Sequence, residues 1–174
     1  MRMVRVTVVA VLLGALVLPA LALAVTRYGD RGVNRLNGGA GADRLYGLGG
    51  NDRLSGRGGA DRLVGGTGND RVYGGTGNDS VDGGDGDDRI YGGHGADRIV
   101  EAGFGDDHIV GGPGSDYIVA RRGNDAVFGG TGNDTIYGGT GLDTVDCGPG
   151  RDVLYVNVRS DRARSRNCEV IRGT

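Results

Sequence analysis

The chain has few of the residues on which catalysis and nucleic-acid binding depend. Its 174 residues include two histidines, two cysteines and no tryptophan, and the formal net charge is −2. A charge so close to zero gives no electrostatic basis for binding nucleic acid. His94 and His108 lie in different stretches and neither has an evident nucleophile or metal partner. We therefore expect no catalytic residues and a protein that is not an enzyme.

Glycine is abundant, with 39 residues, and it recurs at a fixed period. Residues 29–155 divide into fourteen frames of nine, such as GGTGNDRVY at 65–73. Column four is Gly in every frame, column six is Asp in all but the first, which has Asn34, and column eight is Leu, Ile or Val. The phase slips once, at Glu101, which stands as an extra residue between Val100 and Ala102. A fixed period of this kind predicts a solenoid, in which each unit packs only against its neighbours.

The columns also predict the shape of each coil. A glycine-rich hexad followed by three residues with a central aliphatic indicates a tight turn and then a very short strand. Because side chains alternate across a strand, column eight should face inward and columns seven and nine should face solvent. Two frames then close one coil of eighteen residues, with alternate frames on opposite edges. Seven such coils would be about 34 Å long at ~4.8 Å per coil.

These columns resemble the calcium-binding nonapeptide repeats of the RTX family over residues 29–155. The match is best at 65–100, 111–119 and 129–146, whereas the frames at 47, 56, 120 and 147 depart from the consensus, for example with Leu48 and Arg57 in column two. The resemblance implies an all-β fold, a right-handed parallel β-roll (β-solenoid) of about seven coils with two nonapeptides each, closed by a C-terminal cap.

The resemblance also implies calcium ions between stacked turns, held by column-six carboxylates and turn carbonyl oxygens. One edge would carry Asp43, Asp61, Asp79, Asp97, Asp116, Asp134 and Asp152. The other edge would carry Asp52, Asp70, Asp88, Asp107, Asp125 and Asp143. If every gap between successive turns holds an ion, the chain binds up to about eleven calcium ions.

The chemistry of the repeated residues indicates calcium independently of the resemblance to the RTX family. Carboxylates stacked at every coil repel one another, and oxygen ligands on flexible glycine-rich turns suit calcium better than the stricter octahedron of magnesium. Each frame also buries only one aliphatic side chain for nine ordered residues, so we expect the fold to depend on calcium. The alternative is a β-solenoid whose aspartates are ordinary solvated turn residues.

The two ends differ in composition from the repeats. Residues 1–24 combine Arg2 and Arg5, an apolar run and a small-residue site at 22–24, which predicts a secretory signal peptide, with an uncleaved membrane anchor as the alternative. We expect an N-terminal cap with the first degenerate repeat at 25–37, the calcium-binding β-roll at 38–155 and a C-terminal cap at 156–174. Outside the cell, Cys147 and Cys168 should form one disulfide that pins this cap, although two free thiols remain an alternative.

The sequence thus favours a secreted, extracellular calcium-binding protein that folds on binding several ions, a structural or binding module without a membrane span after signal cleavage. The alternative is a calcium-dependent adhesin or surface-layer component, associated with the cell surface, that binds an envelope polysaccharide or a surface protein. Two features of the walls bear on it: a column-seven arginine stripe, and a column-nine ladder of Tyr73, Tyr91, Val110 and Phe128. Threonines form no continuous rank across coils, which disfavours an ice-binding solenoid. A carbohydrate-degrading solenoid enzyme finds little support.

Overall fold

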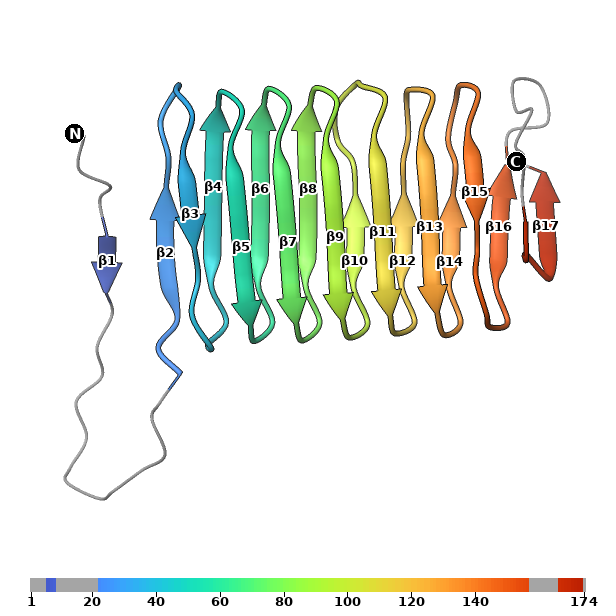
Figure 1. Ribbon diagram of the computed structural model, residues 1–174, viewed down its shortest axis with the longest axis horizontal. Coiled ribbons are helices and arrows are strands. Elements are labelled where there is room, and N and C mark those ends of the chain that lie inside the picture. Colours follow the sequence, from blue (N-terminus) through green and yellow to red (C-terminus); the bar gives the residue numbers. More distant parts are fainter. Residues whose placement is uncertain (1–5, 9–21, 157–165, 174) are drawn as a thin grey trace, which may run out of the picture.

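Where the structure describes the chain, the protein is a solenoid of strands and turns. We describe it from a computed structural model, which defines residues 6–8, 22–156 and 166–173. Strands follow one another alternately into two sheets, so the chain winds around the long axis of the molecule in about seven coils (Figure 1). This confirms the all-β parallel β-solenoid that the repeat predicts.

The first sheet has the strand order β1-β2-β4-β6-β8-β10-β12-β14-β16-β17 in the described residues. Its strands are β1 (Val6–Val8), β2 (Val25–Tyr28), β4 (Arg44–Gly49), β6 (Arg62–Thr67), β8 (Ser80–Asp85), β10 (Arg98–Val100), β12 (Tyr117–Val119), β14 (Thr135–Tyr137), β16 (Val153–Val156) and β17 (Val170–Gly173). The second sheet has the order β15-β13-β11-β9-β7-β5-β3. Its strands are β3 (Arg35–Asn37), β5 (Arg53–Gly58), β7 (Arg71–Thr76), β9 (Arg89–His94), β11 (His108–Pro113), β13 (Ala126–Thr131) and β15 (Thr144–Asp146).

Column eight forms the core between the two sheets. All fourteen of its aliphatic side chains are at most 2% exposed, and each pairs in register with the residue one coil away, as Leu54 does with Val72. The core residues are Leu36, Leu45, Leu54, Leu63, Val72, Val81, Ile90, Ile99, Ile109, Ile118, Val127, Ile136, Val145 and Leu154. The inward direction predicted for this column is confirmed.

Many strands are longer than the three residues predicted from the sequence. β7, for example, continues from Arg71 through the glycines of the next frame to Thr76, where Gly75 pairs with Gly93 of the next coil. The hexad is therefore not all turn, because its first three columns form parallel backbone ladders. The glycines let neighbouring backbones approach closely, but they do so within the strands as well as in the turns. A Cβ at Gly75 would collide with the carbonyl oxygen of Arg57.

The array begins one strand earlier than the predicted first frame. β2 pairs in parallel with β4, with Thr26 opposite Arg44 and Arg27 opposite the core residue Leu45. Arg27 thus occupies the column-eight position of an additional strand, which the aliphatic pattern could not reveal. β1 pairs antiparallel with β2. That residues 25–37 act as an N-terminal cap stays a prediction.

Most of the predicted signal peptide lies outside the described residues, since 1–5 and 9–21 are not among them. Much of the predicted C-terminal cap, 157–165, also lies outside them. In the part of the chain that the structure defines, no helix has the length and apolarity that crossing a bilayer requires.

A disulfide joins Cys147, which is fully buried, to Cys168, with a Cα–Cα distance of 5.2 Å. It connects the last coil to a returning segment, in which β17 pairs with β16 and Arg166 bridges to Asp146. The Cys147 N–H donates to the Arg166 carbonyl oxygen at 3.1 Å. The segment therefore extends the first sheet beyond β16. Its role as a cap remains a prediction.

Candidate calcium-binding edges

Turns along the two edges of the solenoid place the column-six aspartates. Each aspartate directly precedes a strand: Asp79 precedes β8 in the first sheet, and Asp70 precedes β7 in the second. Alternate frames therefore belong to opposite edges. All thirteen aspartates are buried, with at most 4% of each residue exposed. The sequence predicted their recurrence on two edges, but not that the carboxylates turn away from solvent.

One carboxylate oxygen of each aspartate links neighbouring coils. The Asp61 N–H donates to Asp79 Oδ1 at 2.8 Å, and the Asp79 N–H donates to Asp97 Oδ1 at 2.8 Å. The same bond runs along the other edge, for example from the Asp52 N–H to Asp70 Oδ1 at 2.6 Å. It continues across the slip from the Asp88 N–H to Asp107 Oδ1 at 2.9 Å. Column six is therefore a hydrogen-bonded ladder along both edges.

The second carboxylate oxygen, Oδ2, is in most of these residues fully buried and without a hydrogen-bond donor among the described atoms. This holds for Asp52, Asp61, Asp70, Asp79, Asp88, Asp97, Asp116, Asp125, Asp134 and Asp152. Asp43, at the beginning of one edge, differs because its Oδ2 accepts the Gly39 N–H at 2.5 Å. A buried carboxylate oxygen without a donor is costly unless a cation compensates it.

Backbone carbonyl oxygens surround the same positions. A Cβ built on Gly47 would meet Oδ2 of Asp52 and the carbonyl oxygen of Gly65, so both oxygens approach one point in the gap between coils. The same pair of acceptors recurs at Gly56, where Oδ2 of Asp61 meets the Gly74 carbonyl oxygen. Only glycine fits at these positions. Carboxylate and carbonyl oxygens on adjacent turns are the donor set that calcium prefers, so the residues present fit the ion.

Burial also raises the pKa of the column-six carboxyls. Desolvation raises the pKa of Asp79, Asp88 and Asp116 to about 7, and the neighbouring aspartates of the ladder add to the increase. The hydrogen bond from the preceding coil acts in the opposite direction but is the smaller effect. The ladder therefore holds its negative charge poorly by itself, and a cation between the turns would favour the ionised form.

A second ladder, which the sequence reasoning missed, runs along the outer rim of the turns in column five. Its side-chain oxygens accept main-chain N–H groups one coil later: Asn51 accepts from Asn69 at 2.9 Å, and Asp106 accepts from Asn124 at 2.7 Å. These residues are exposed. The signal was the frequent Asn, Asp or Ser before the column-six Asp, as in Asn69 and Ser115. This ladder positions the turns, and its oxygens already have donors.

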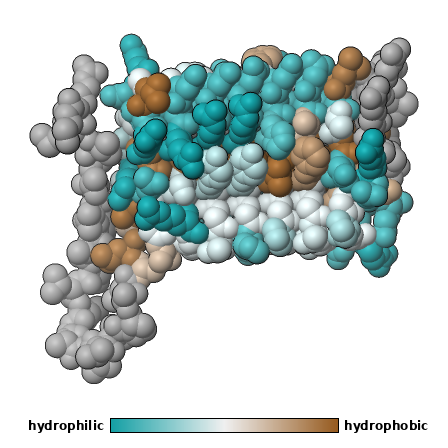
Figure 2. Space-filling model, viewed as in Figure 1, coloured by the Kyte–Doolittle hydropathy of each residue, from teal (hydrophilic) through white to brown (hydrophobic). Residues whose placement is uncertain are grey.

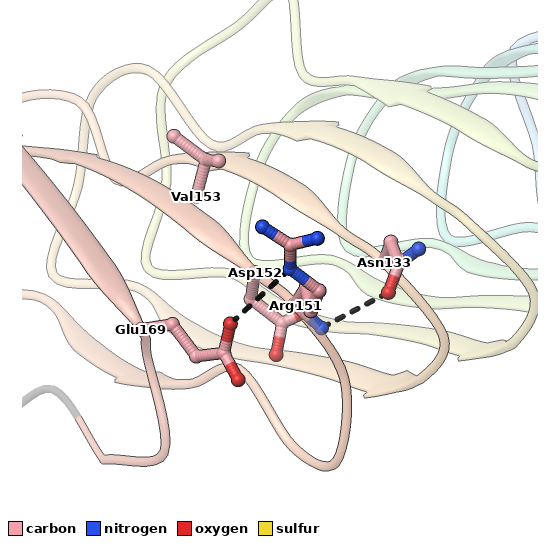
Figure 3. A pocket seen from close by; sticks show the side chains of 5 residues that line it. All are labelled: Asn133, Arg151, Asp152, Val153 and Glu169. Carbon is pink, nitrogen blue, oxygen red and sulfur yellow. Dashed lines mark hydrogen bonds and ion pairs between the residues drawn. The ribbon is translucent and has the colours of Figure 1, made fainter.

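The last turn of the array lies in a shallow depression lined by Asn133, Arg151, Asp152, Val153 and Glu169 (Figure 3). Asn133 Oδ1 accepts the Arg151 N–H at 3.0 Å, which ends the column-five ladder on this edge. Arg151 Nε lies 3.9 Å from Glu169 Oε2, but the arginine side chain is 88% exposed. So exposed an ion pair contributes little. The depression therefore lies at the end of the candidate edge, next to Asp152.

The two histidines stand apart from both edges. His94 ends β9 and is exposed. His108 begins β11, and its half-buried ring lies between Tyr91 and Phe128, at centroid distances of 6.1 and 5.3 Å. His108 thus belongs to an aromatic ladder with Tyr91 and Phe128 on the outer face of the second sheet.

Together these features define a class of protein: a parallel β-solenoid with buried carboxylates and carbonyl oxygens repeated along two edges. The profile of the RTX calcium-binding nonapeptide repeat matches residues 28–63, 64–99, 99–127 and 120–154. The chain belongs to the RTX calcium-binding nonapeptide repeat family, and its repeats form a calcium-binding module. No curated protein matches the chain significantly.

Proposed function

We propose that this chain is a secreted protein that folds when several calcium ions bind along both edges of the solenoid, and that the column-six aspartates are the side-chain ligands. The observation that carries the proposal is the row of buried Oδ2 atoms without donors, most of which lie beside a carbonyl oxygen of the next coil, as Asp52 does beside Gly65. RTX repeat proteins are typically secreted, and the N-terminal sequence pattern agrees with export. Calcium is plentiful outside cells, where affinities of ~0.1–1 mM suffice.

The proposed coupling to folding follows from how little apolar surface each unit buries. A frame contributes one buried aliphatic residue, such as Val72, while its glycines favour the unfolded chain. An ion that binds only the folded state shifts the equilibrium toward that state. The ligand set predicts several ions per chain, and the number of usable gaps is at most about eleven.

Calcium titration calorimetry on the chain lacking residues 1–24 tests the proposal. We expect heat of binding for several ions per chain, together with the heat of the folding that the ions drive. Binding of one ion or fewer would overturn it. Magnesium at the same concentrations serves as the control ion and should bind much more weakly.

A second candidate role, an adhesin for acidic polysaccharide, rests on an arginine ladder on the second sheet. Arg35, Arg53, Arg71 and Arg89 pair directly across adjacent strands. All four are exposed, and no ion pair of theirs occurs in the part of the chain that the structure defines. Figure 2 shows hydrophilic side chains in rows that cross successive coils on one face. A row of like charges at strand spacing suits a polyanion.

Binding to an immobilised acidic polysaccharide, with and without calcium, tests this second role. Replacing Arg71 and Arg89 with glutamine should abolish retention in calcium. Replacing Arg31 and Arg151, which lie outside the ladder, should leave it unchanged. Retention that is equal in all three proteins would exclude the ladder as the binding surface.

A further inference from the structure

The extra residue in the repeat changes which oxygen atoms line one gap between coils. Glu101 lies eighteen residues after Gly83, and its N–H donates to the Val119 carbonyl oxygen at 3.0 Å. Column-one glycines make the same bond, as Gly38 does to Ser55 at 2.7 Å. The backbone of Glu101 therefore occupies a column-one position. The register is recovered in the residues that follow, so a side chain is present where regular frames have none.

This side chain is directed back into the preceding turn. Glu101 is fully buried, its Oε1 accepts the Gly83 N–H at 3.1 Å, and its Oε2 accepts the Gly84 N–H at 3.2 Å. In a regular gap, a Cβ built on the column-one glycine would meet an aspartate Oδ2 and a carbonyl oxygen of the next coil. At Gly83 it would meet Oδ2 of Asp88 and Oε2 of Glu101. A second carboxylate oxygen is thus closer to this point than any carbonyl oxygen.

Three carboxylates converge at this point. One oxygen from each of Asp88, Glu101 and Asp107 lies within 4.8 Å of the others, and all three residues are buried. Asp88 is 1% exposed, and its Oδ2, which is directed into the cluster, has no donor among the described atoms. No basic side chain forms an ion pair with the cluster in the residues that the structure defines. The donors identified for Glu101 and for Asp107 Oδ1 are main-chain N–H groups.

Electrostatics make such a cluster unfavourable unless it holds a cation. Burial, reinforced by Asp107 and Asp88, raises the pKa of Glu101 to about 9, and burial raises the pKa of Asp88 to about 7. Charge count is one of the properties by which calcium sites set their affinity, and a fixed main-chain cradle adds rigidity. The gap at Glu101 combines both, whereas the regular gaps have one carboxylate fewer.

We propose that Asp88, Glu101 and Asp107 form a calcium site of a second kind, which binds calcium more tightly than the regular gaps and fills first. This inference rests on the proposed function, because it assumes that the neighbouring gaps also bind calcium. The extra residue then serves as a high-affinity starting point near the middle of the array, from which the regular gaps on either side fill.

Calorimetric calcium titration of the chain without residues 1–24, compared with its Glu101→Gln variant, tests this site. We expect one ion in a class at least about tenfold tighter than the rest. Glu101→Gln keeps the shape of the side chain but removes its charge, so the tight class should disappear while the weaker ions still bind. Asp87→Asn is the matched control: it removes one exposed charge from the same turn, where Asp87 Oδ1 bonds the Asp106 N–H, and should keep the tight class.

The outcomes separate this inference from the proposed function. No calcium binding to the parent protein would overturn both. A single class of equivalent sites, or a tight class that survives Glu101→Gln, would overturn only the site; the second result means that Glu101 carries a proton. If Glu101→Gln fails to fold in saturating calcium, Glu101→Gly decides, because it restores the column-one residue. Loss of the tight class in a folded Glu101→Gly protein supports the site, and its retention, or loss of the fold in this variant too, overturns it.

Discussion

The main-chain N–H of Asp70 donates a 2.7 Å hydrogen bond to Oδ1 of Asp88, one coil further along the solenoid. The other oxygen of Asp88 is buried and has no donor among the described atoms. A single side chain therefore has two functions, since one oxygen joins adjacent coils and the other is available to an ion. Each aspartate accepts a hydrogen bond from one neighbouring coil and donates one to the next. Replacing one aspartate should therefore also weaken the coils next to it on the same edge.

Two substitutions of Asp79 distinguish its bond to the neighbouring coil from its proposed contact with an ion. Asp79→Asn keeps an oxygen for the Asp61 N–H but removes the charge, so we expect at least one fewer bound ion. Each lost ion should cost about 1.4 kcal/mol of unfolding free energy at a calcium concentration ten times Kd. Asp79→Ala should cost a further ~1–3 kcal/mol, because it leaves that buried N–H without an acceptor. Calcium counting and thermal unfolding measure the two effects.

The control for this prediction is Asp106→Asn, which removes an exposed charge from the outer ladder. It should change neither the number of ions nor the stability by more than about 0.5 kcal/mol. Equal ion counts in Asp79→Asn and the parent protein would show that column six does not supply the ligands.

The raised pKa values predict how the calcium-free fold depends on pH. The pKa of Asp79 and Asp125 rises from 3.8 to about 7, so the folded state binds more protons than the unfolded state between these values. The contribution of these groups to stability is complete below about pH 4 and is lost as the pH rises toward 7. In chelator, β structure should therefore be greater at the acidic end of this window. Circular dichroism during a pH titration measures it, and a rise in β structure toward neutral pH would be the opposite result.

Alanine substitutions at Gly38 and Gly39 test whether a glycine is needed for close packing or only for flexibility of the turn. A Cβ on Gly38 would collide with Oδ2 of Asp43 and the carbonyl oxygen of Gly56, whereas a Cβ on Gly39 has no neighbour closer than 3.9 Å. Gly38→Ala should destabilise the calcium-bound protein by about 1–3 kcal/mol through overpacking. Gly39→Ala should be neutral or stabilising by up to about 1 kcal/mol. Similar melting temperatures for the two variants would contradict the packing in column one.

The disulfide should contribute mainly by restricting the unfolded chain. It spans 21 residues, so replacing both Cys147 and Cys168 with serine should lower the unfolding free energy by about 3 kcal/mol in the chain-entropy model. Alkylation without reductant, read by mass spectrometry, should find no free thiol. Two labelled cysteines in the purified protein would contradict the bridge.

The sequence was sufficient to predict the solenoid, because its period shows directly in the core. Leu54 and Val72 stack in register as column eight required, and Tyr73 stacks on Tyr91 at 5.1 Å as the column-nine ladder required. The recurrence of the aspartates on two edges was equally visible. These features depend only on the spacing of residue types, and that spacing recurs in every frame of the repeat.

Other features depend on backbone geometry that spacing does not contain. The carboxylates turn inward to meet a main-chain N–H one coil away, a contact that residue type alone cannot show. Arg27 was missed because an arginine in an aliphatic column breaks the pattern, and strand pairing alone reveals it. In the sequence Glu101 is only an extra residue in the repeat, yet its backbone occupies a glycine position and its side chain enters the turn.

Circular dichroism of the chain without residues 1–24, in chelator and then in about 10 mM calcium, tests the central claim most directly, since this concentration exceeds the affinities usual for extracellular modules. The account predicts a largely disordered chain at neutral pH in chelator that gains β structure cooperatively as calcium is added. A far-ultraviolet spectrum that is the same in chelator and in calcium would contradict it.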